Sequence, residues 1–243
     1  MEPELSPRSA PLTYPGRFPA SSVVFDGEVE RHVTGLADVD RLLAAHDTPL
    51  MARRRPVLAV GSNACTAQLR EKFEAAGVNP VVPLTRCTVS GVRVGLIPLV
   101  TRYGYIPSAP VFEPGHQSHL FVVWFDDEQL RAVDATELGP YARSELGAEV
   151  TVALDGVRLD RVDAYTSALG VLSLDRWPDG IASQTQLIER VLQQFHWRGR
   201  LLDVRTAGEW VAHFRADVGA RAAFAVDCER LGLVDGVTAP AQA

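Results

Sequence analysis

The stretch Val57-Leu58-Ala59-Val60-Gly61-Ser62-Asn63 is the part of the chain around which the fold is predicted. Its apolar run predicts a buried strand that ends at Gly61. Residues 66–76 then have the composition of a helix, which Gly77 would end. A strand that leads through a Gly-Ser-Asn loop into a helix can direct several backbone N–H groups at one ligand. The same tripeptide also fits an ordinary strand-to-helix turn, and both interpretations stay open on the loop alone.

The composition is that of a globular protein with a net negative charge. Hydrophobic residues make up 47% of the 243 residues, and 24 Lys and Arg stand against 30 Asp and Glu, a net charge of −6. This balance argues against a protein that binds nucleic acid by neutralising phosphates. The basic run Arg53-Arg54-Arg55 is interpreted as a solvated entry to the following strand. Neither a membrane span nor a secretory signal is expected, because long apolar runs are lacking and the N-terminus is acidic and proline-rich.

Cysteine and histidine usage predicts neither disulfides nor a metal site. Cys65, Cys87 and Cys228 are far apart and odd in number, which favours reduced thiols and a cytoplasmic location. Cys65 follows the Gly-Ser-Asn loop and could be a nucleophile, but a small buried residue is the favoured interpretation since no His lies near it in sequence. His116 and His119 fall in a predicted loop without a third ligand.

The chain divides into four predicted parts. Prolines at every fourth position predict that residues 1–22 form a proline-rich tail or arm lying on the surface. Residues 23–55 are an N-terminal arm with a short strand, a turn at Asp26-Gly27 and a helix. Residues 56–180 are the main domain, and residues 181–243 a helical C-terminal extension with a capping box at Thr206.

Within the main domain most of the predicted secondary structure is strand. Residues 80–100 alternate in hydropathy and predict strands broken at Gly91. Residues 101–119 are rich in Gly and Pro and predict a long loop. Residues 120–125 form a continuous apolar strand, central in a sheet. Asp155-Gly156 predicts the turn of a hairpin.

One carboxylate falls on an apolar helical face. A helix capped by Asp126 or Asp127 carries Leu130 and Val133 on one face, and Glu137 follows them at helical spacing. A carboxylate there is directed toward the core or a cleft, where it can shuttle protons. The alternative is that the helix ends earlier and Glu137 points to water.

Taken together, these motifs resemble the γ-glutamylcyclotransferase-like family between about Val57 and Thr166. The first motif is the Tyr-Gly-Ser-Asn loop, here Val60-Gly61-Ser62-Asn63. The second is a strand ending in Val-Val-Trp, here residues 122–124, followed by a helix that carries Glu137. Two tyrosines complete the pattern, Tyr141 after the helix and Tyr165 after the hairpin. Val60 stands where the family has Tyr, and Leu138 where it has Gly.

The resemblance implies an α+β fold, with a small mixed β-barrel-like sheet, flanking helices and a cavity at one end. It implies an enzyme in which the α-amine of a γ-glutamyl amide or amine attacks the substrate's own γ-carbonyl and releases 5-oxoproline. Glu137 would be the general acid/base, without a metal or organic cofactor. The partner would be a small γ-glutamyl substrate, with neither nucleic acid nor membrane involved. The implied substrate-binding residues are Val60, Gly61, Ser62, Asn63, Tyr141 and Tyr165.

Two other classes of function remain open. One is a non-catalytic small-molecule binding module that keeps the pocket and has lost the chemistry. The other is an interaction protein that works through its helical C-terminus, suggested by Trp197, Trp210 and Phe214 in amphipathic stretches. These aromatic residues are also typical of an ordinary core.

Overall fold

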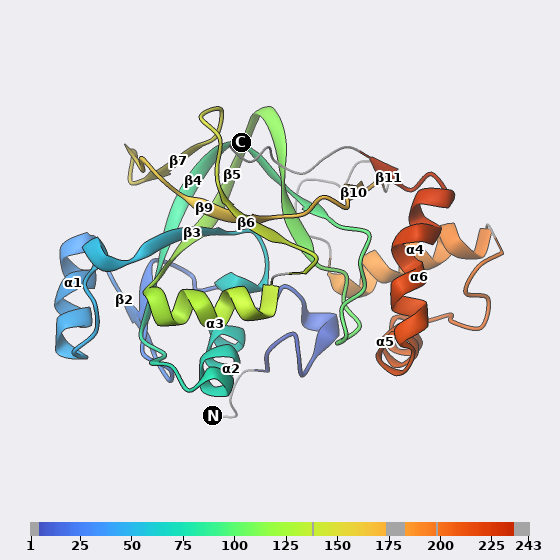
Figure 1. Ribbon diagram of the computed structural model, residues 1–243, viewed down its shortest axis with the longest axis horizontal. Coiled ribbons are helices and arrows are strands. Elements are labelled where there is room, and N and C mark those ends of the chain that lie inside the picture. The colour runs from blue at the N-terminus through green and yellow to red at the C-terminus, as the bar shows by residue number, and fades with distance from the viewer. Residues whose placement is uncertain (1–4, 138, 174–182, 198, 236–243) are drawn as a thin grey trace.

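The computed structural model describes residues 5–137, 139–173, 183–197 and 199–235. Within these residues a large mixed sheet is flanked by six α-helices (Figure 1). Leu138 and the predicted domain boundary at residue 180 lie outside the described residues. None of the described helices is long and apolar enough to cross a membrane.

The helices and strands have the following bounds. The helices are α1 (Leu36–Ala45), α2 (Thr66–Ala76), α3 (Asp127–Glu137), α4 (Gln184–Trp197), α5 (Ala207–Ala216) and α6 (Val218–Arg230), with the short 3-10 helices η1 (Pro11–Thr13), η2 (Met51–Arg53) and η3 (Ser62–Ala64). The strands are β1 (Val23–Phe25), β2 (Glu30–His32), β3 (Arg55–Ala59), β4 (Val82–Leu96), β5 (Ser108–Phe125), β6 (Ala142–Glu145), β7 (Thr151–Leu154), β8 (Val157–Arg158), β9 (Asp163–Thr166), β10 (Val171–Leu172) and β11 (Val234–Asp235).

The main sheet is an open path of strands. Its order is β2-β1-β4-β5-β3-β9-β6, with β7 added to β4 and β8 to β7. Among the strands that the structure describes, β3 and β9 run parallel and the other pairs of this sheet run antiparallel. The predicted mixed sheet with flanking helices is confirmed. Its barrel-like closure is not, because β2 and β6 do not pair with each other in the described structure.

The long hairpin of β4 and β5 corrects the predicted loop over residues 101–119. Residues 108–119 belong to β5; residues 108–112 and 117–119 pair with β4, and the register shifts between them opposite Gly91, whose φ is +90°. The Gly and Pro content suggested a loop, but Pro is tolerated in a strand that has a neighbour on one side. On its other side, β5 pairs with β3 from Phe121 onward, beyond these residues. Pro110 and Pro114 therefore sit where no third strand needs their missing N–H groups. His116 and His119 lie on this strand rather than in a loop.

Several shorter predictions are confirmed. Helix α1 covers the predicted arm helix, and α2 ends at Gly77 in the left-handed conformation. Thr206 and Glu209 form the capping box of α5. The turn at Asp155-Gly156 has positive φ at both residues, as a tight hairpin requires.

Part of the proline-rich N-terminal segment, η1 and Tyr14, packs into the body of the molecule, whereas a surface position was predicted. Helix η1 contacts α4, and the Tyr14 side chain is 6% exposed. The Tyr14 ring stacks on Tyr105 with centroids 4.4 Å apart. The proline spacing predicted an extended backbone. It could not reveal that the large aromatic side chain of Tyr14 is buried against the rest of the protein.

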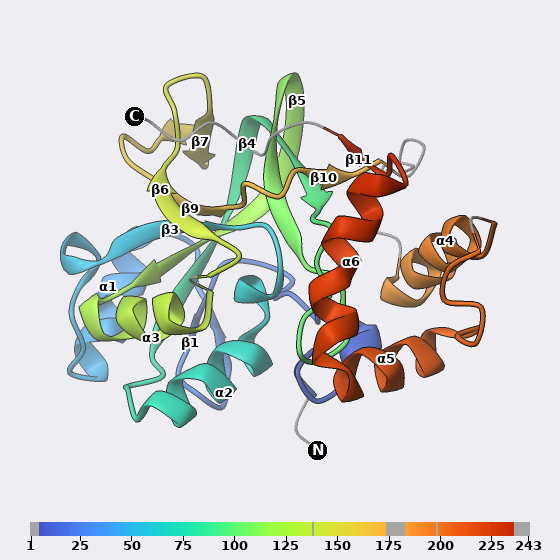
Figure 2. The same cartoon turned by 45° about the vertical axis from the view of Figure 1, so that its right-hand side comes forward.

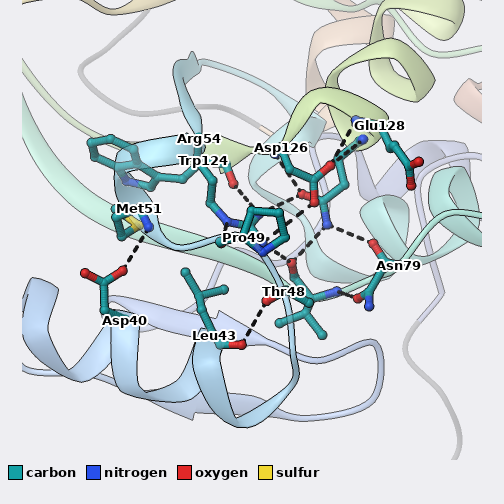
Figure 3. Close-up of polar contacts among 12 residues, drawn as sticks. Asp40, Leu43, Thr48, Pro49, Met51, Arg54, Asn79, Trp124, Asp126 and Glu128 are labelled. Atoms are coloured by element: carbon teal, nitrogen blue, oxygen red, sulfur yellow. Dashed lines mark hydrogen bonds and ion pairs between the residues drawn. The ribbon is translucent and has the colours of Figure 1, made fainter.

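The basic run before β3 is only partly solvated, which corrects its interpretation. Arg53 and Arg55 are exposed, but the Arg54 side chain is fully buried. Figure 3 shows its polar contacts. Its guanidinium donates to the backbone carbonyls of Pro49 (2.8 Å), Trp124 (3.0 Å) and Val81 (3.3 Å) and to Gln129 Oε1 (2.9 Å), with the Asp126 carboxylate 3.7 Å away. Burial lowers the pKa of Arg54 to about 10, so the group stays charged at neutral pH. Arg54 therefore ties η2, β5 and the start of α3 together.

The core has separate parts under the sheet and among the C-terminal helices. Clusters on the two sides of the sheet contain residues such as Leu58 and Val57, which alternate along β3. A third cluster joins α4, α5 and α6 to the loop between β4 and β5. Figure 2 shows these three helices together on one side of the molecule. Trp210 and Phe214 are fully buried in it, so they offer no surface for the predicted interaction protein. The Trp197 side chain lies outside the described residues.

Candidate functional site

A cavity of about 430 Å³ opens where the end of β3, the first turns of α2, the end of α3 and the start of β5 meet. This size is typical of a small-molecule pocket. All seven residues that the sequence assigned to a site line this one cavity: Val60, Gly61, Ser62, Asn63, Glu137, Tyr141 and Tyr165. The helical-face argument for Glu137 and the loop argument for Gly61 thus lead to the same place.

Glu137 is the last residue of α3 and is paired with a lysine. Its Oε1 accepts from Lys72 Nζ in an ion pair, and Lys72 also donates to Asn63 Oδ1 at 2.7 Å. The Lys72 side chain is 1% exposed and that of Glu137 18%. Burial lowers the pKa of Lys72, and the Glu137 charge opposes this shift. Glu137 Oε2 has no protein partner among the described residues and remains available to a ligand.

The Gly-Ser-Asn loop continues directly into η3. Gly61 precedes the turn, and the N–H groups that begin such a turn have no acceptor inside it. The Ser62 side chain accepts from Gln68 Nε2 at 2.6 Å, which fixes it against α2. Gln68 is 2% exposed, and its Oε1 is buried without a hydrogen-bond partner in the described structure.

Tyr14 places a phenol beside Gly61. Its hydroxyl lies 2.7 Å from Ser108 Oγ and accepts from the Ser108 N–H at 2.9 Å. A Cβ on Gly61 would lie 2.4 Å from this hydroxyl and 2.5 Å from Ser108 Oγ. Burial raises the pKa of Tyr14 to about 12. Val60 has no hydroxyl, and its side chain packs in the core, so the phenol next to Gly61 comes from the N-terminal segment.

The two predicted tyrosines have their hydroxyl protons engaged by the protein. Tyr141 donates to the Ser108 carbonyl at 2.8 Å, and Tyr165 donates to Asp134 Oδ1 at 2.6 Å. Asp134 is also paired with Arg143 at 2.9 Å. These tyrosines shape the cavity wall, and only their oxygen lone pairs remain for a ligand.

The C-terminal helices hold the loop that forms another wall of the cavity. Trp210 Nε1 donates to the Gly104 carbonyl at 3.0 Å. Gln184 accepts from the Ile106 N–H at 2.8 Å and donates to the Ile106 carbonyl at 3.3 Å. Arg215 Nε donates to the Tyr103 carbonyl at 3.0 Å. The helical extension therefore fixes residues 103–106 next to the site.

Sequence reasoning missed the cations and the N-terminal residues of the cavity. Gln68 and Lys72 are four residues apart and share a helical face with buried apolar residues, so the argument applied to Glu137 would have found Lys72 as well. Arg8 and Tyr14 carry no such signal, because they come from a segment without the apolar periodicity of a helix or strand. Tyr14 meets Ser108 across 94 residues of sequence.

The three cysteines are buried and form no disulfide within the described residues. None of them lines the cavity. Burial raises the pKa values of Cys87 and Cys228 to about 12, which suits inert core residues. No group of three or more His, Cys, Asp or Glu suitable for a metal ion occurs in the described part of the chain.

Comparisons with known proteins identify no family. No family profile and no curated protein matches the chain. A solved structure of a γ-glutamyl cyclotransferase aligns at 17% identity and a TM-score of 0.36, over 46% of this chain and 65% of that one. The chain thus spans less than two thirds of that protein. A solution structure of an Arabidopsis thaliana protein aligns at 14% identity and a TM-score of 0.35, over 62% and 87%. Alignments at these TM-scores establish neither a family nor an activity.

Proposed function

We propose that the protein is a cyclotransferase-like enzyme that cleaves a γ-glutamyl amide or amine and releases 5-oxoproline. The observation that carries the proposal is that Glu137 and the Gly61-Ser62-Asn63 turn line one cavity, as the sequence resemblance requires. A carboxylate and a set of backbone donors in one pocket suit acyl transfer to an internal amine.

The reaction needs no redox partner. The substrate's α-amine nitrogen forms a bond to its own γ-carbonyl carbon, and the bond from this carbon to the leaving nitrogen breaks. Glu137 Oε2 accepts the proton from the α-amine and returns it to the leaving nitrogen. The Asn63 N–H group is a candidate to stabilise the developing oxyanion, and the Ser62 N–H, which faces the Tyr14 hydroxyl, is another if a substrate displaces that contact. Both reacting groups belong to one molecule, so a pocket that selects the folded-back conformer lowers the entropic cost.

Lys72 orients the carboxylate in this scheme. It holds Glu137 Oε1 and the Asn63 side chain together, so the base and the turn keep a fixed spacing. The same ion pair also favours the second candidate, a non-catalytic binding module, because it satisfies the Glu137 charge and its Oε1 without a substrate.

The test is 5-oxoproline release from a panel of γ-glutamyl amines and dipeptides. Glu137→Gln should lower turnover by about 100-fold or more, because a general acid/base supplies about 10²–10⁴ in rate. Glu128→Gln is the matched control, since Glu128 is exposed on the same helix. Unchanged turnover in Glu137→Gln would contradict the assignment of Glu137 as the general acid/base. Binding of panel members to the folded protein without turnover would favour the binding module.

A further inference from the structure

The charges that line the cavity are unbalanced. Three cations, Arg8, Lys72 and Arg102, stand against one carboxylate, Glu137. The lining therefore has a formal charge of +2 in a protein whose net charge is −6. Glu137 is paired with Lys72, so within the described part of the chain the two guanidinium groups carry the charge that no ion pair balances.

The two arginines lie against one aromatic ring. The guanidinium carbon of Arg8 lies 5.5 Å from the centroid of the Tyr103 ring, and that of Arg102 lies 4.9 Å from it. Arg102 also donates to the Tyr103 hydroxyl at 2.6 Å. Neither arginine has a carboxylate partner among the described residues, although two cations that share one ring repel each other.

The backbone of Arg8 is held in place, while its side-chain Nε finds no acceptor among the described residues. Its carbonyl accepts from Arg215 Nη2 at 3.0 Å, and Arg215 also binds the Tyr103 carbonyl. Arg8 Nε is buried without a hydrogen-bond partner in the described structure. An unsatisfied buried donor costs about 1–3 kcal/mol, so such a group calls for an explanation.

Three stacked tyrosines connect the arginines to the proposed reaction centre. Tyr103 stacks on Tyr105 with centroids 6.0 Å apart, and Tyr105 stacks on Tyr14 with centroids 4.4 Å apart. The Tyr14 hydroxyl is next to Gly61. A ligand that reaches from Gly61 along this wall ends at the two guanidinium groups.

We propose that Arg8 and Arg102, on the Tyr103 ring, form an oxyanion subsite for a carboxylate or phosphate group on the part of the ligand that leaves. Guanidinium groups present paired N–H donors that match either oxyanion. The inference rests on the proposed function in one respect: that function identifies the part of the ligand near Glu137 as a γ-glutamyl group. It makes the two arginines determinants of specificity, because a neutral leaving amine leaves them unpaired.

Calorimetry with unreactive anions tests the subsite without turnover. The probes are glutarate, its monoamide glutaramate, and inorganic phosphate. Glutarate should bind about tenfold more tightly than glutaramate, a typical effect of one charge-assisted contact. Arg8→Gln and Arg102→Gln should each remove most of that difference, and Arg8→Lys should retain part of it. A phosphate affinity above that of glutarate assigns a phosphate-bearing ligand, and the reverse order assigns a carboxylate.

Arg158→Gln is the matched control, because Arg158 is exposed on β8 and does not line the cavity. If Arg8→Gln fails to fold, Arg102→Gln gives the answer alone, since Arg102 is exposed. Equal affinity of wild type for glutarate and glutaramate, with phosphate unbound, overturns the subsite. So does binding that both arginine variants leave unchanged.

The proposed function and the subsite fail in different ways. If anion binding depends on the arginines but no substrate yields 5-oxoproline, the subsite stands and the proposed enzymatic function is wrong. If the enzyme turns over substrates equally well whether the leaving group carries a carboxylate or the corresponding amide, the proposed function stands and the subsite is wrong. With both correct, Arg8→Gln raises KM about tenfold for a carboxylate-bearing leaving group and leaves kcat nearly unchanged.

Discussion

Lys72 and Glu137 form an ion pair between α2 and α3, although 65 residues separate them in the sequence. Burying a lysine costs desolvation energy, and here the charge of Glu137 and the Asn63 side chain offset it. The pair therefore links the stability of the two helices to the geometry of the cavity.

Removing one partner of this pair should destabilise the fold. Glu137→Gln leaves the Lys72 charge buried without a counter-charge, at a cost of about 3 kcal/mol. Adding Lys72→Met should recover most of that loss, because an apolar chain of similar length needs no partner. Urea unfolding of the two single variants and the double variant measures the coupling. If the changes in unfolding free energy of the two single variants add up to that of the double variant, Lys72 and Glu137 are not energetically coupled.

This measurement also supports the activity test. Turnover of Glu137→Gln is informative only for the folded fraction, which the unfolding curve gives. Exposed Glu128 on the same helix provides the control, and Glu128→Gln should change stability by less than about 0.5 kcal/mol.

Gly61→Ala should be destabilising, by about 1–3 kcal/mol. The new Cβ would lie within 2.5 Å of Tyr14 and Ser108 side-chain oxygens, both fixed by their mutual hydrogen bond. Thermal unfolding measures the loss. Adding Tyr14→Phe and Ser108→Ala removes both obstacles and should restore part of the stability.

Gly208→Ala is the matched control for this substitution. Gly208 lies in α5, and the nearest atom to an added Cβ is 3.9 Å away. Alanine is a better helix former than glycine by about 1 kcal/mol, so this variant should be as stable as wild type or more stable. A Gly61→Ala protein as stable as this control would contradict the close approach of Tyr14 to Gly61.

The sequence predicted those parts of the site that follow from local periodicity. Glu137 came from its helical face and Gly61 from the end of a strand, and both line the cavity. Lys72 was accessible to the same reasoning. The roles of these residues in catalysis stay predictions, because position in a cavity does not establish chemistry.

Long-range packing decided what sequence patterns could not. The Gly and Pro content of residues 101–119 predicted a loop, yet pairing with β4 makes most of it strand. Arg54 looked like its exposed neighbours, and only the carbonyl groups around it explain its burial. Tyr14 and Arg8 reach the cavity through contacts with residues about 100 positions away, which no local pattern records.

Acid should weaken the contribution of Asp134 to stability. Partial burial opposes its ionisation, but hydrogen bonds from Arg143 and Tyr165 outweigh this and hold the pKa of Asp134 below its ordinary value. A carboxylate with a lowered folded-state pKa stabilises the protein above its unfolded-state pKa of about 3.9, and this contribution is lost as pH falls through the folded-state value. The free-energy difference between wild type and Asp134→Asn should therefore be largest near pH 7 and shrink below about pH 4. Urea unfolding across this range measures it, and a difference independent of pH would show that the charge of Asp134 is not responsible.

Gln184 should control the order of the loop that carries Arg102 and Tyr103. Its amide satisfies both the N–H and the carbonyl of Ile106, which is fully buried. Gln184→Met leaves both groups unpaired at a cost of about 1–3 kcal/mol each. Hydrogen exchange should therefore accelerate across residues 97–107 more than in the strands of the sheet. Gln193→Met is the control, because Gln193 is exposed on the same helix. If both variants exchange alike in this loop, α4 does not support the cavity wall through Gln184.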